Sequence, residues 1–220
     1  CEFKNFPLED INDFPTLIKS NPTLCGLSIT IPHKQSVMQF LDEIAPSAKK
    51  VGAVNCIKRW QMTDGRWQMA GYNTDVFGFE ESLKPLLTPH HKKALILGSG
   101  GASKAIQYVL KKINIDYYLV SRSKKQEARS KTYSELNEEI ISTHSIIVNT
   151  TPLGMFPAIN DCPNIPYPFL SSTHLLYDLN YNPEESLFLK KGKEKGAQIK
   201  NGLEMLHLQA EKAWEIWNSR

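Results

Sequence analysis

The stretch Ala94-Leu-Ile-Leu-Gly-Ser-Gly-Gly-Ala-Ser103 decides the fold of this chain. A short apolar run ends in a cluster of glycines, and the pattern that follows is that of a helix. Four apolar residues of that pattern share one helix face: Ala105, Ile106, Val109 and Leu110. A strand that passes through a glycine turn into a helix is the phosphate-binding unit of dinucleotide-binding folds. Glycine turns also occur without ligands, and Ser103 replaces the third glycine of the fingerprint.

Within this turn the residues have separate predicted roles. Gly98 permits a tight turn, and Gly100 lets the backbone approach a pyrophosphate closely. The helix that begins near Ala102 offers unpaired N–H groups and the positive end of its dipole. We therefore predict a nucleotide site formed by Gly98, Gly100, Gly101 and Ala102.

The next predicted strand, 116–120, indicates which nucleotide is bound. NAD-binding units usually carry an acidic residue at the end of this strand, which accepts a hydrogen bond from the ribose 2′-hydroxyl. Here the strand is followed by Ser121-Arg-Ser-Lys-Lys125, which has no acid. A guanidinium and hydroxyl groups suit a 2′-phosphate, so we predict NADP, held by Ser121, Arg122, Ser123 and Lys125. A solvated basic loop is the alternative interpretation.

Composition excludes several classes of function. The 220 residues are 41% hydrophobic and 22% charged, as in ordinary globular proteins, and the net charge of +3 is too small to indicate a nucleic-acid partner. No apolar run approaches the ~20 residues that span a membrane. The four cysteines are widely spaced and the six histidines show no metal-ligand spacing, so we predict no metal site and a reducing, cytoplasmic location.

The order of the predicted elements indicates an α/β fold. Strands at 94–97, 116–120, 145–148, 174–179 and 197–199 alternate with helices, which implies a parallel sheet. The first part reads as a strand at 27–31, an amphipathic helix from Val37 to Ile44 and a hairpin within 54–72 that turns at Asp64-Gly65. The last segment is a predicted helix with this apolar face: Leu203, Leu206, Ala210, Ala213, Trp214 and Trp217.

Three polar residues of the first part could carry chemistry. Lys34 follows a predicted strand and lies near the start of the predicted helix, where the dipole disfavours a cation and favours proton release. A surface lysine without a catalytic role is the alternative. Asp75 either caps a helix or presents its carboxylate to a ligand or to Lys34. Asn55 either binds a polar substrate or serves a turn.

Six motifs in order resemble the shikimate dehydrogenase family. They are Ser28-Ile-Thr-Ile-Pro-His-Lys34, Val51-Gly-Ala-Val-Asn55, Gly71-Tyr-Asn-Thr-Asp75, Gly98-Ser-Gly-Gly-Ala-Ser103, Asn149-Thr-Thr-Pro-Leu-Gly-Met155 and Asn201-Gly-Leu-Glu-Met-Leu-His-Leu-Gln209. The resemblance implies reversible, NADP-dependent interconversion of 3-dehydroshikimate and shikimate. It also implies two domains, a substrate-binding α/β domain formed by residues 1–76 and 202–220 and a Rossmann-like NADP-binding domain formed by residues 77–201.

The resemblance also implies the roles of individual residues. Lys34 matches the catalytic lysine and Asp75 its carboxylate partner. The matches to substrate-binding residues are Thr30, Asn55, Tyr181 and Gln209. The further matches to cofactor-binding residues are Thr150 and Gly202, the latter near the nicotinamide.

The chain departs from the family pattern at several positions. Ser28 and Ser121 stand where asparagine is common, and Asn180 stands where an apolar residue is common. Family members begin with a strand and a loop whose two serines bind the shikimate carboxylate, whereas this chain opens at what resembles the second strand. Roughly 25–30 residues of the family pattern are absent ahead of Cys1, so we expect either that a natural segment is missing from this sequence or that the chain is a fragment.

Two alternative functions stay open from the sequence. One is a quinate/shikimate dehydrogenase with broader specificity or NAD use, and the other is a non-catalytic NADPH-binding homologue. Monomer and homodimer both fit the sequence.

Overall fold

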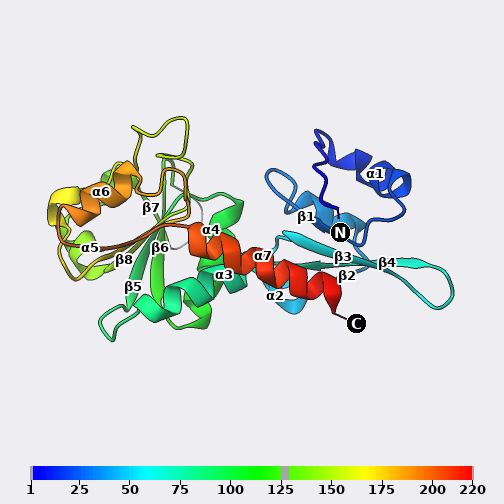
Figure 1. The fold of residues 1–220 in the computed structure, drawn as a ribbon. Coiled ribbons are helices and arrows are strands. Elements are labelled where there is room, and N and C mark those ends of the chain that lie inside the picture. Colours follow the sequence, from blue (N-terminus) through cyan, green and yellow to red (C-terminus); the bar gives the residue numbers. More distant parts are fainter. Residues whose placement is uncertain (1, 125–128, 220) are drawn as a thin grey trace. The chain divides into compact units, whose positions relative to one another are not determined.

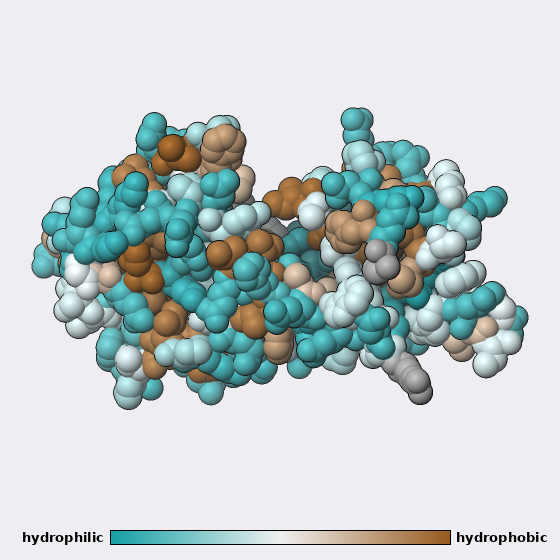
Figure 2. Space-filling view, in the orientation of Figure 1, coloured by the Kyte–Doolittle hydropathy of each residue, from teal (hydrophilic) through white to brown (hydrophobic). Residues whose placement is uncertain are grey.

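The computed structural model describes residues 2–124 and 129–219. The chain forms two compact units, the first made of residues Cys1–Thr74 and Ala213–Arg220 and the second of Asp75–Lys212. Figure 1 shows the elements of both, and hydrophilic residues dominate the visible surface (Figure 2). None of the described helices is both long and apolar enough to cross a bilayer.

The first unit is built on a four-stranded sheet in the order β1-β3-β4-β2. Its strands are β1 (Gly26–Ser28), β2 (Glu43–Ile44), β3 (Cys56–Gln61) and β4 (Trp67–Tyr72), and its helices are α1 (Phe14–Ser20) and α2 (Pro46–Val51). The predicted hairpin is confirmed, since β3 and β4 pair antiparallel and Gly65 takes a positive φ of 84° in the turn between them. Phe14, Val37 and Ile57 are central in the core of this unit.

Two predicted elements of the first unit are wrong in detail. The strand expected at 27–31 ends at Ser28 as β1, and the α-helix expected from Val37 to Ile44 is a 3-10 helix at Ser36–Phe40 followed by β2. The backbone N–H groups of Asp42 and Ala45 donate to Met69 O (3.0 Å) and Gly71 O (2.9 Å) of β4. Sheet pairing therefore overrides a helical apolar pattern, although Val37 is fully buried as the pattern implied.

The second unit has a six-stranded parallel sheet in the order β10-β9-β8-β5-β6-β7. The strands are β5 (Lys93–Leu97), β6 (Asp116–Ser121), β7 (Ser130–Thr132), β8 (Ile146–Asn149), β9 (Leu175–Asp178) and β10 (Gln198–Lys200). Numbered along the chain within this unit, the order is 6-5-4-1-2-3, which is the doubly wound arrangement of dinucleotide-binding folds. The five predicted strands are confirmed, and β7 is an additional strand.

Helices cover both faces of this sheet. The helices are α3 (Thr74–Leu83), α4 (Gly101–Lys112), α5 (Glu138–Thr143), α6 (Leu187–Lys193) and α7 (Leu203–Asn218). Side chains of α5 and α6 join one core cluster with Leu95, Leu97 and Leu176, and Figure 1 shows these two helices on one side of the sheet. On the other side Phe79 of α3 meets the ring of Tyr177 edge-on, with ring centroids 5.1 Å apart.

The predicted apolar face of α7 is only partly correct. Ala213 is buried, and Leu206 and Trp217 are half-buried. Leu203, Ala210 and Trp214 are exposed, with Trp214 52% accessible. The inward face instead includes Met205 and Gln209, and Gln209 lies against Gly78 of α3. Gly78 has no side chain, so the two helices approach closely there.

Candidate functional site: a dinucleotide crevice and a polar turn region

The glycine turn joins β5 to α4 as the sequence predicts. Gly98 has a φ of +107°, a conformation that favours glycine, and its N–H donates to Val120 O at 2.8 Å. A Cβ at this position would lie 2.7 Å from Thr150 Oγ1. Gly98 is therefore required both by the backbone conformation and by the close approach of the loop after β8.

Beyond Gly98 the turn is open toward a ligand. A Cβ on Gly100 or Gly101 would meet nothing within 4 Å. Among the described residues the N-terminus of α4 has no side-chain cap, because its N-cap residue is Gly100, and Ser103 donates its hydroxyl back to Gly100 O at 2.7 Å. The small, fully buried Ser103 thus fills the third fingerprint position while the first N–H groups of α4 stay available to an anion.

The basic segment predicted to hold a 2′-phosphate directly follows β6. Ser121 ends β6, is buried, and donates to Ser123 O at 2.7 Å, which forms a compact turn. Arg122 is exposed at this turn. The predicted site residue Lys125 lies outside the described residues.

An acid near this segment escaped the sequence analysis. Glu135 accepts from Lys124 Nζ at 3.1 Å and from the backbone N–H of Thr132 at 2.6 Å. These hydrogen bonds lower the pKa of Glu135 to about 2. The capping-box pattern Thr132-x-x-Glu135 could have indicated it. Both Arg122 and Lys124 are exposed, but Lys124 is already paired with Glu135, so Arg122 is the better candidate for a 2′-phosphate.

Thr150 links the loop after β8 to the glycine turn. Its N–H and its hydroxyl both donate to Leu97 O at 2.8 Å, and the hydroxyl also reaches Gly98 O at 3.4 Å. β5, the first strand of this sheet along the chain, lies between β6 and β8. The strand order therefore reverses at β5, with β6 and β7 on one side of it and β8 to β10 on the other. Ligands of open α/β sheets bind at this switch point, outside the carboxyl ends of the strands.

In the first unit, Lys34 lies in a turn and not in a helix. The turn spans 31–35, the Lys34 side chain is half-buried, and Lys34 O accepts from Val54 N–H at 2.7 Å. The argument from a helix dipole at Lys34 therefore does not apply. Thr30, just before this turn, is exposed.

Asn55 is buried and bound to the start of α3. Its Oδ1 accepts from the N–H of Thr74 at 2.7 Å, and its Nδ2 donates to Thr74 Oγ1 at 3.0 Å. The neighbouring Asn73 donates to Ala53 O at 2.9 Å. These contacts hold the two ends of the β3–β4 hairpin together and place Asp75, half-buried, in the first turn of α3.

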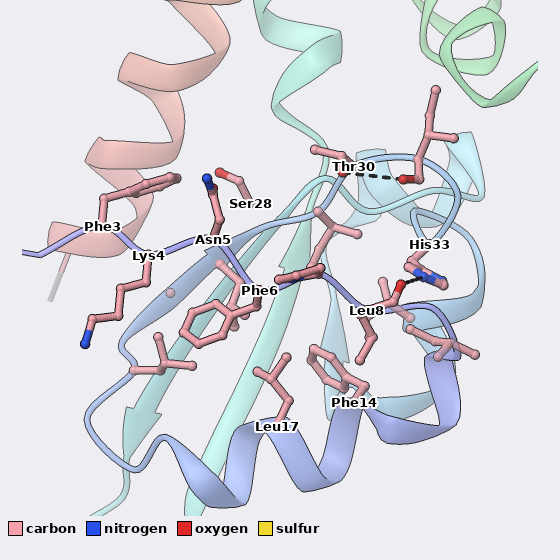
Figure 3. A pocket seen from close by; sticks show the side chains of 18 of the residues that line it. Phe3, Lys4, Asn5, Phe6, Leu8, Phe14, Leu17, Ser28, Thr30 and His33 are labelled. Carbon is pink, nitrogen blue, oxygen red and sulfur yellow. Dashed lines mark hydrogen bonds between the residues drawn. The ribbon is translucent and has the colours of Figure 1, made fainter.

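A groove of about 580 Å³ opens in the first unit (Figure 3). It is bounded by the segment 2–9, by α1 and by β1, which pairs with β3 alone among the described strands. Its walls are mainly apolar, and Ser28, Thr30 and His33 lie along its rim. His33 Nε2 is 2.7 Å from Leu8 O. The groove brings together Ser28 and Thr30, whereas Lys34 and Asn55 are not among its lining residues.

The remaining predicted residues belong to the second unit. Tyr181 is 48% accessible and follows β9. Gly202 approaches the backbone of Leu179 so closely that a Cβ would overlap its carbonyl, so its glycine is required by packing. Gln209 is half-buried on α7 and donates to Leu206 O at 3.0 Å.

A buried carboxylate at the end of β9 is a second feature that the sequence analysis missed. Asp178, the last residue of β9, is completely buried, and burial raises its pKa to about 6. Its neighbours Asn149 and Ser186 are also buried.

Within 2–124 and 129–219 no group of three or more potential metal ligands is assembled. Cys25, Cys56 and Cys162 are free thiols, and burial raises the pKa of Cys56 to about 12. His91, His144 and His174 are buried with hydrogen-bond partners, as structural histidines are.

The doubly wound sheet and its open glycine turn define a dinucleotide-binding protein of the Rossmann type. A family model described as the shikimate dehydrogenase substrate binding domain matches residues 2–57. The shikimate dehydrogenase (NADP(+)) of Clostridium beijerinckii is 41% identical over 201 residues, covering 87% of this chain and 71% of that protein.

Solved structures agree with this relationship. Shikimate dehydrogenase from Aquifex aeolicus has a TM-score of 0.81 at 33% identity, covering 95% of this chain and 78% of the other. The Thermus thermophilus enzyme, solved with NADP(H) and shikimate, has a TM-score of 0.80 at 28% identity, covering 95% and 79%. The chain belongs to the shikimate dehydrogenase family.

Proposed function

We propose that this chain catalyses the reversible NADP-dependent reduction of 3-dehydroshikimate to shikimate. The observation that carries the proposal is the open glycine turn, with Arg122 directly after a neighbouring strand whose carboxyl end carries no acid, in a member of this family. For the domains we propose the boundaries given by the sequence, a substrate-binding domain of residues 1–76 with 202–220 and a cofactor-binding domain of residues 77–201.

The residues of the second unit fit NADP. The open backbone at Gly100 and Gly101 and the uncapped N-terminus of α4 suit a pyrophosphate, and Arg122 suits a 2′-phosphate. Thr150 holds the adjoining loop against the turn. When bound, NADPH supplies the hydride for reduction of the ring ketone.

The proposed proton chemistry belongs to Lys34 and Asp75. The Lys34 ammonium would donate a proton to the oxygen of the carbonyl as negative charge develops there. Asp75 would orient that ammonium and balance its charge. Thr30, Asn55, Tyr181 and Gln209 would bind the hydroxyl and carboxylate groups of the substrate, and Gly202 would lie near the nicotinamide.

Turnover measurements distinguish this proposal from its alternatives. Initial rates are compared for shikimate and quinate, each with NADP⁺ and with NAD⁺. We expect the highest kcat/KM for shikimate with NADP⁺. Equal kcat/KM values for quinate, or for NAD⁺, would favour the broader dehydrogenase, and tight NADPH binding without turnover would favour the non-catalytic homologue.

We further propose a cytoplasmic location and a monomeric or homodimeric state. The free thiols Cys25, Cys56 and Cys162 support a reducing compartment. The modest net charge of +3 agrees with a small-molecule substrate and with no nucleic-acid partner.

A further inference from the structure

Asp178 receives hydrogen bonds from three separate segments of the second unit. Its Oδ1 accepts from Asn149 Nδ2 and from the backbone N–H of Asn180, both at 3.0 Å. Its Oδ2 accepts from Ser186 Oγ at 2.5 Å, and Ser186 is the N-cap of α6. One carboxylate therefore connects the end of β8, the loop after β9 and the start of α6.

Its partners extend this connection into the loop after β8. Asn149 lies directly opposite Asp178 in the β8–β9 ladder, and its Oδ1 accepts from the N–H of Thr151 at 3.0 Å and the Thr151 hydroxyl at 2.6 Å. Asn180 Nδ2 donates to Thr151 O at 3.1 Å and to Leu153 O at 3.2 Å. Both side chains therefore fix the backbone that follows Asn149.

The loop is also fixed on its other side. Thr150 bonds to the carbonyls of Leu97 and Gly98, so the loop is held between the glycine turn and the Asp178 network. The pyrophosphate site at Gly100 and the 2′-phosphate site at Arg122 lie at the ends of β5 and β6. Since β8 and β9 lie on the opposite side of β5, the nicotinamide half of the cofactor would extend toward their loops.

A contribution to stability does not by itself explain why a carboxylate is buried at position 178. Burying a carboxylate is costly even when its oxygens are bonded, and apolar replacements of buried ionic groups are often neutral or stabilising. The raised pKa of Asp178 reports that cost. The carboxylate sits at the carboxyl edge of the sheet, where Rossmann-type sheets bind their ligands.

We propose that Asp178 is a positioning residue, which fixes the loops after β8 and β9 so that they receive the nicotinamide half of NADP. This inference rests on the proposed function, because it assumes that NADP is the cofactor. Asp178 acts through Asn149 and Asn180 and does not touch the cofactor itself.

Calorimetric binding of two ligands tests the proposal. NADP⁺ uses both halves of the site, whereas 2′,5′-ADP occupies only the adenosine half. In Asp178→Ala we expect the Kd for 2′,5′-ADP to stay unchanged and the Kd for NADP⁺ to rise about tenfold, because the loops lose their fixed geometry. Asp178→Asn should retain both affinities, since an amide oxygen can accept from Asn149 and Asn180 while its NH₂ donates to Ser186.

A matched control removes a buried hydrogen bond elsewhere in the unit. Ser82 Oγ is 2.7 Å from Tyr177 Oη, and Ser82→Ala should lower stability without changing either Kd. Should Asp178→Ala not fold, Asn180→Ala tests the same connection, because it removes the bonds to Thr151 and Leu153 and leaves Asp178 in place.

Each contrary outcome has a distinct meaning. Unchanged NADP⁺ binding in Asp178→Ala and in Asn180→Ala would overturn the positioning role, as would an equal loss of 2′,5′-ADP binding. An equal loss in Asp178→Asn would overturn it too, because charge and not geometry would then matter. If the wild-type chain binds neither ligand, the proposed function fails instead.

Discussion

At the scale of single residues, Arg122 is expected to determine cofactor choice. Replacing it with alanine removes a charge-assisted hydrogen bond to the 2′-phosphate, so NADPH binding should weaken by about 1.5–3 kcal/mol while NADH binding stays the same. Fluorescence titration with both nucleotides measures this. Lys124→Ala is the matched control and should have little effect, because Lys124 already pairs with Glu135 at 3.1 Å. Equal Kd values for NADPH and NADH in the wild-type chain would contradict the assignment.

Lys34 and Asp75 are expected to act as one catalytic unit. Lys34→Ala should lower kcat by about 10²-fold or more, which is typical of a lost general acid or base, with a much smaller change in the KM for shikimate. Asp75→Asn should also be severe, and the double variant should lose far less than the product of the two effects. Lys50→Ala, at the end of α2, is the control. A Lys34→Ala kcat within about threefold of wild type would leave Lys34 without a catalytic role.

At the scale of elements, the glycine turn offers two substitutions with different expected outcomes. Gly98→Ala forces a side chain to a φ of +107° and against Thr150, so both stability and NADPH affinity should fall. Gly100→Ala has a φ of −79° and open space, so thermal stability should be nearly unchanged while NADPH affinity falls. Thermal unfolding and nucleotide titration on both variants separate the two effects. Unaltered NADPH affinity in Gly100→Ala would argue against close approach of a pyrophosphate there.

The elements that sequence predicted best are those with a local signal. The β5–α4–β6 unit has an apolar run, turn glycines and a helical stripe, and all three are local. The β2 segment carries the same helical stripe, but backbone pairing with β4 decides its structure, and such pairing is not local. The polar strand β7, Ser-Lys-Thr, has no alternating apolar pattern, so nothing in the sequence indicates it. The Asp178 network was likewise hidden, because Asn149, Asp178 and Ser186 meet only across two strands and a helix.

At the scale of the whole molecule, two separate hydrophobic cores fix the sheets that bring together residues of different motifs. The doubly wound sheet brings the Gly98 turn and Thr150 together, although they are far apart in the sequence. The hairpin β3–β4 does the same for Asn55 and Thr74. Motif order could indicate these residues, but only the topology explains why they meet.

The buried carboxylate of Asp178 is expected to affect the pH dependence of unfolding. Burial raises its pKa from 3.8 to about 6, so between these values the folded state binds more protons than the unfolded state. Stability should therefore fall as pH rises through this window, by about 3 kcal/mol in all. Glu80 and Glu135 have lowered pKa values, so the stability that they contribute is lost as pH falls below about 4.5.

Comparison with Asp178→Asn isolates this effect, because the other titrating groups are common to both proteins. His91 and His144 have lowered pKa values, so their titration favours the folded state as pH rises. This effect opposes that of Asp178 when the wild-type profile is considered by itself, but it cancels in the difference between the two proteins. In urea unfolding between pH 4.5 and 7, the free energy of unfolding of Asp178→Asn minus that of wild type should therefore increase with pH. A difference that does not vary with pH would show that the Asp178 carboxyl titrates alike in the folded and unfolded chains.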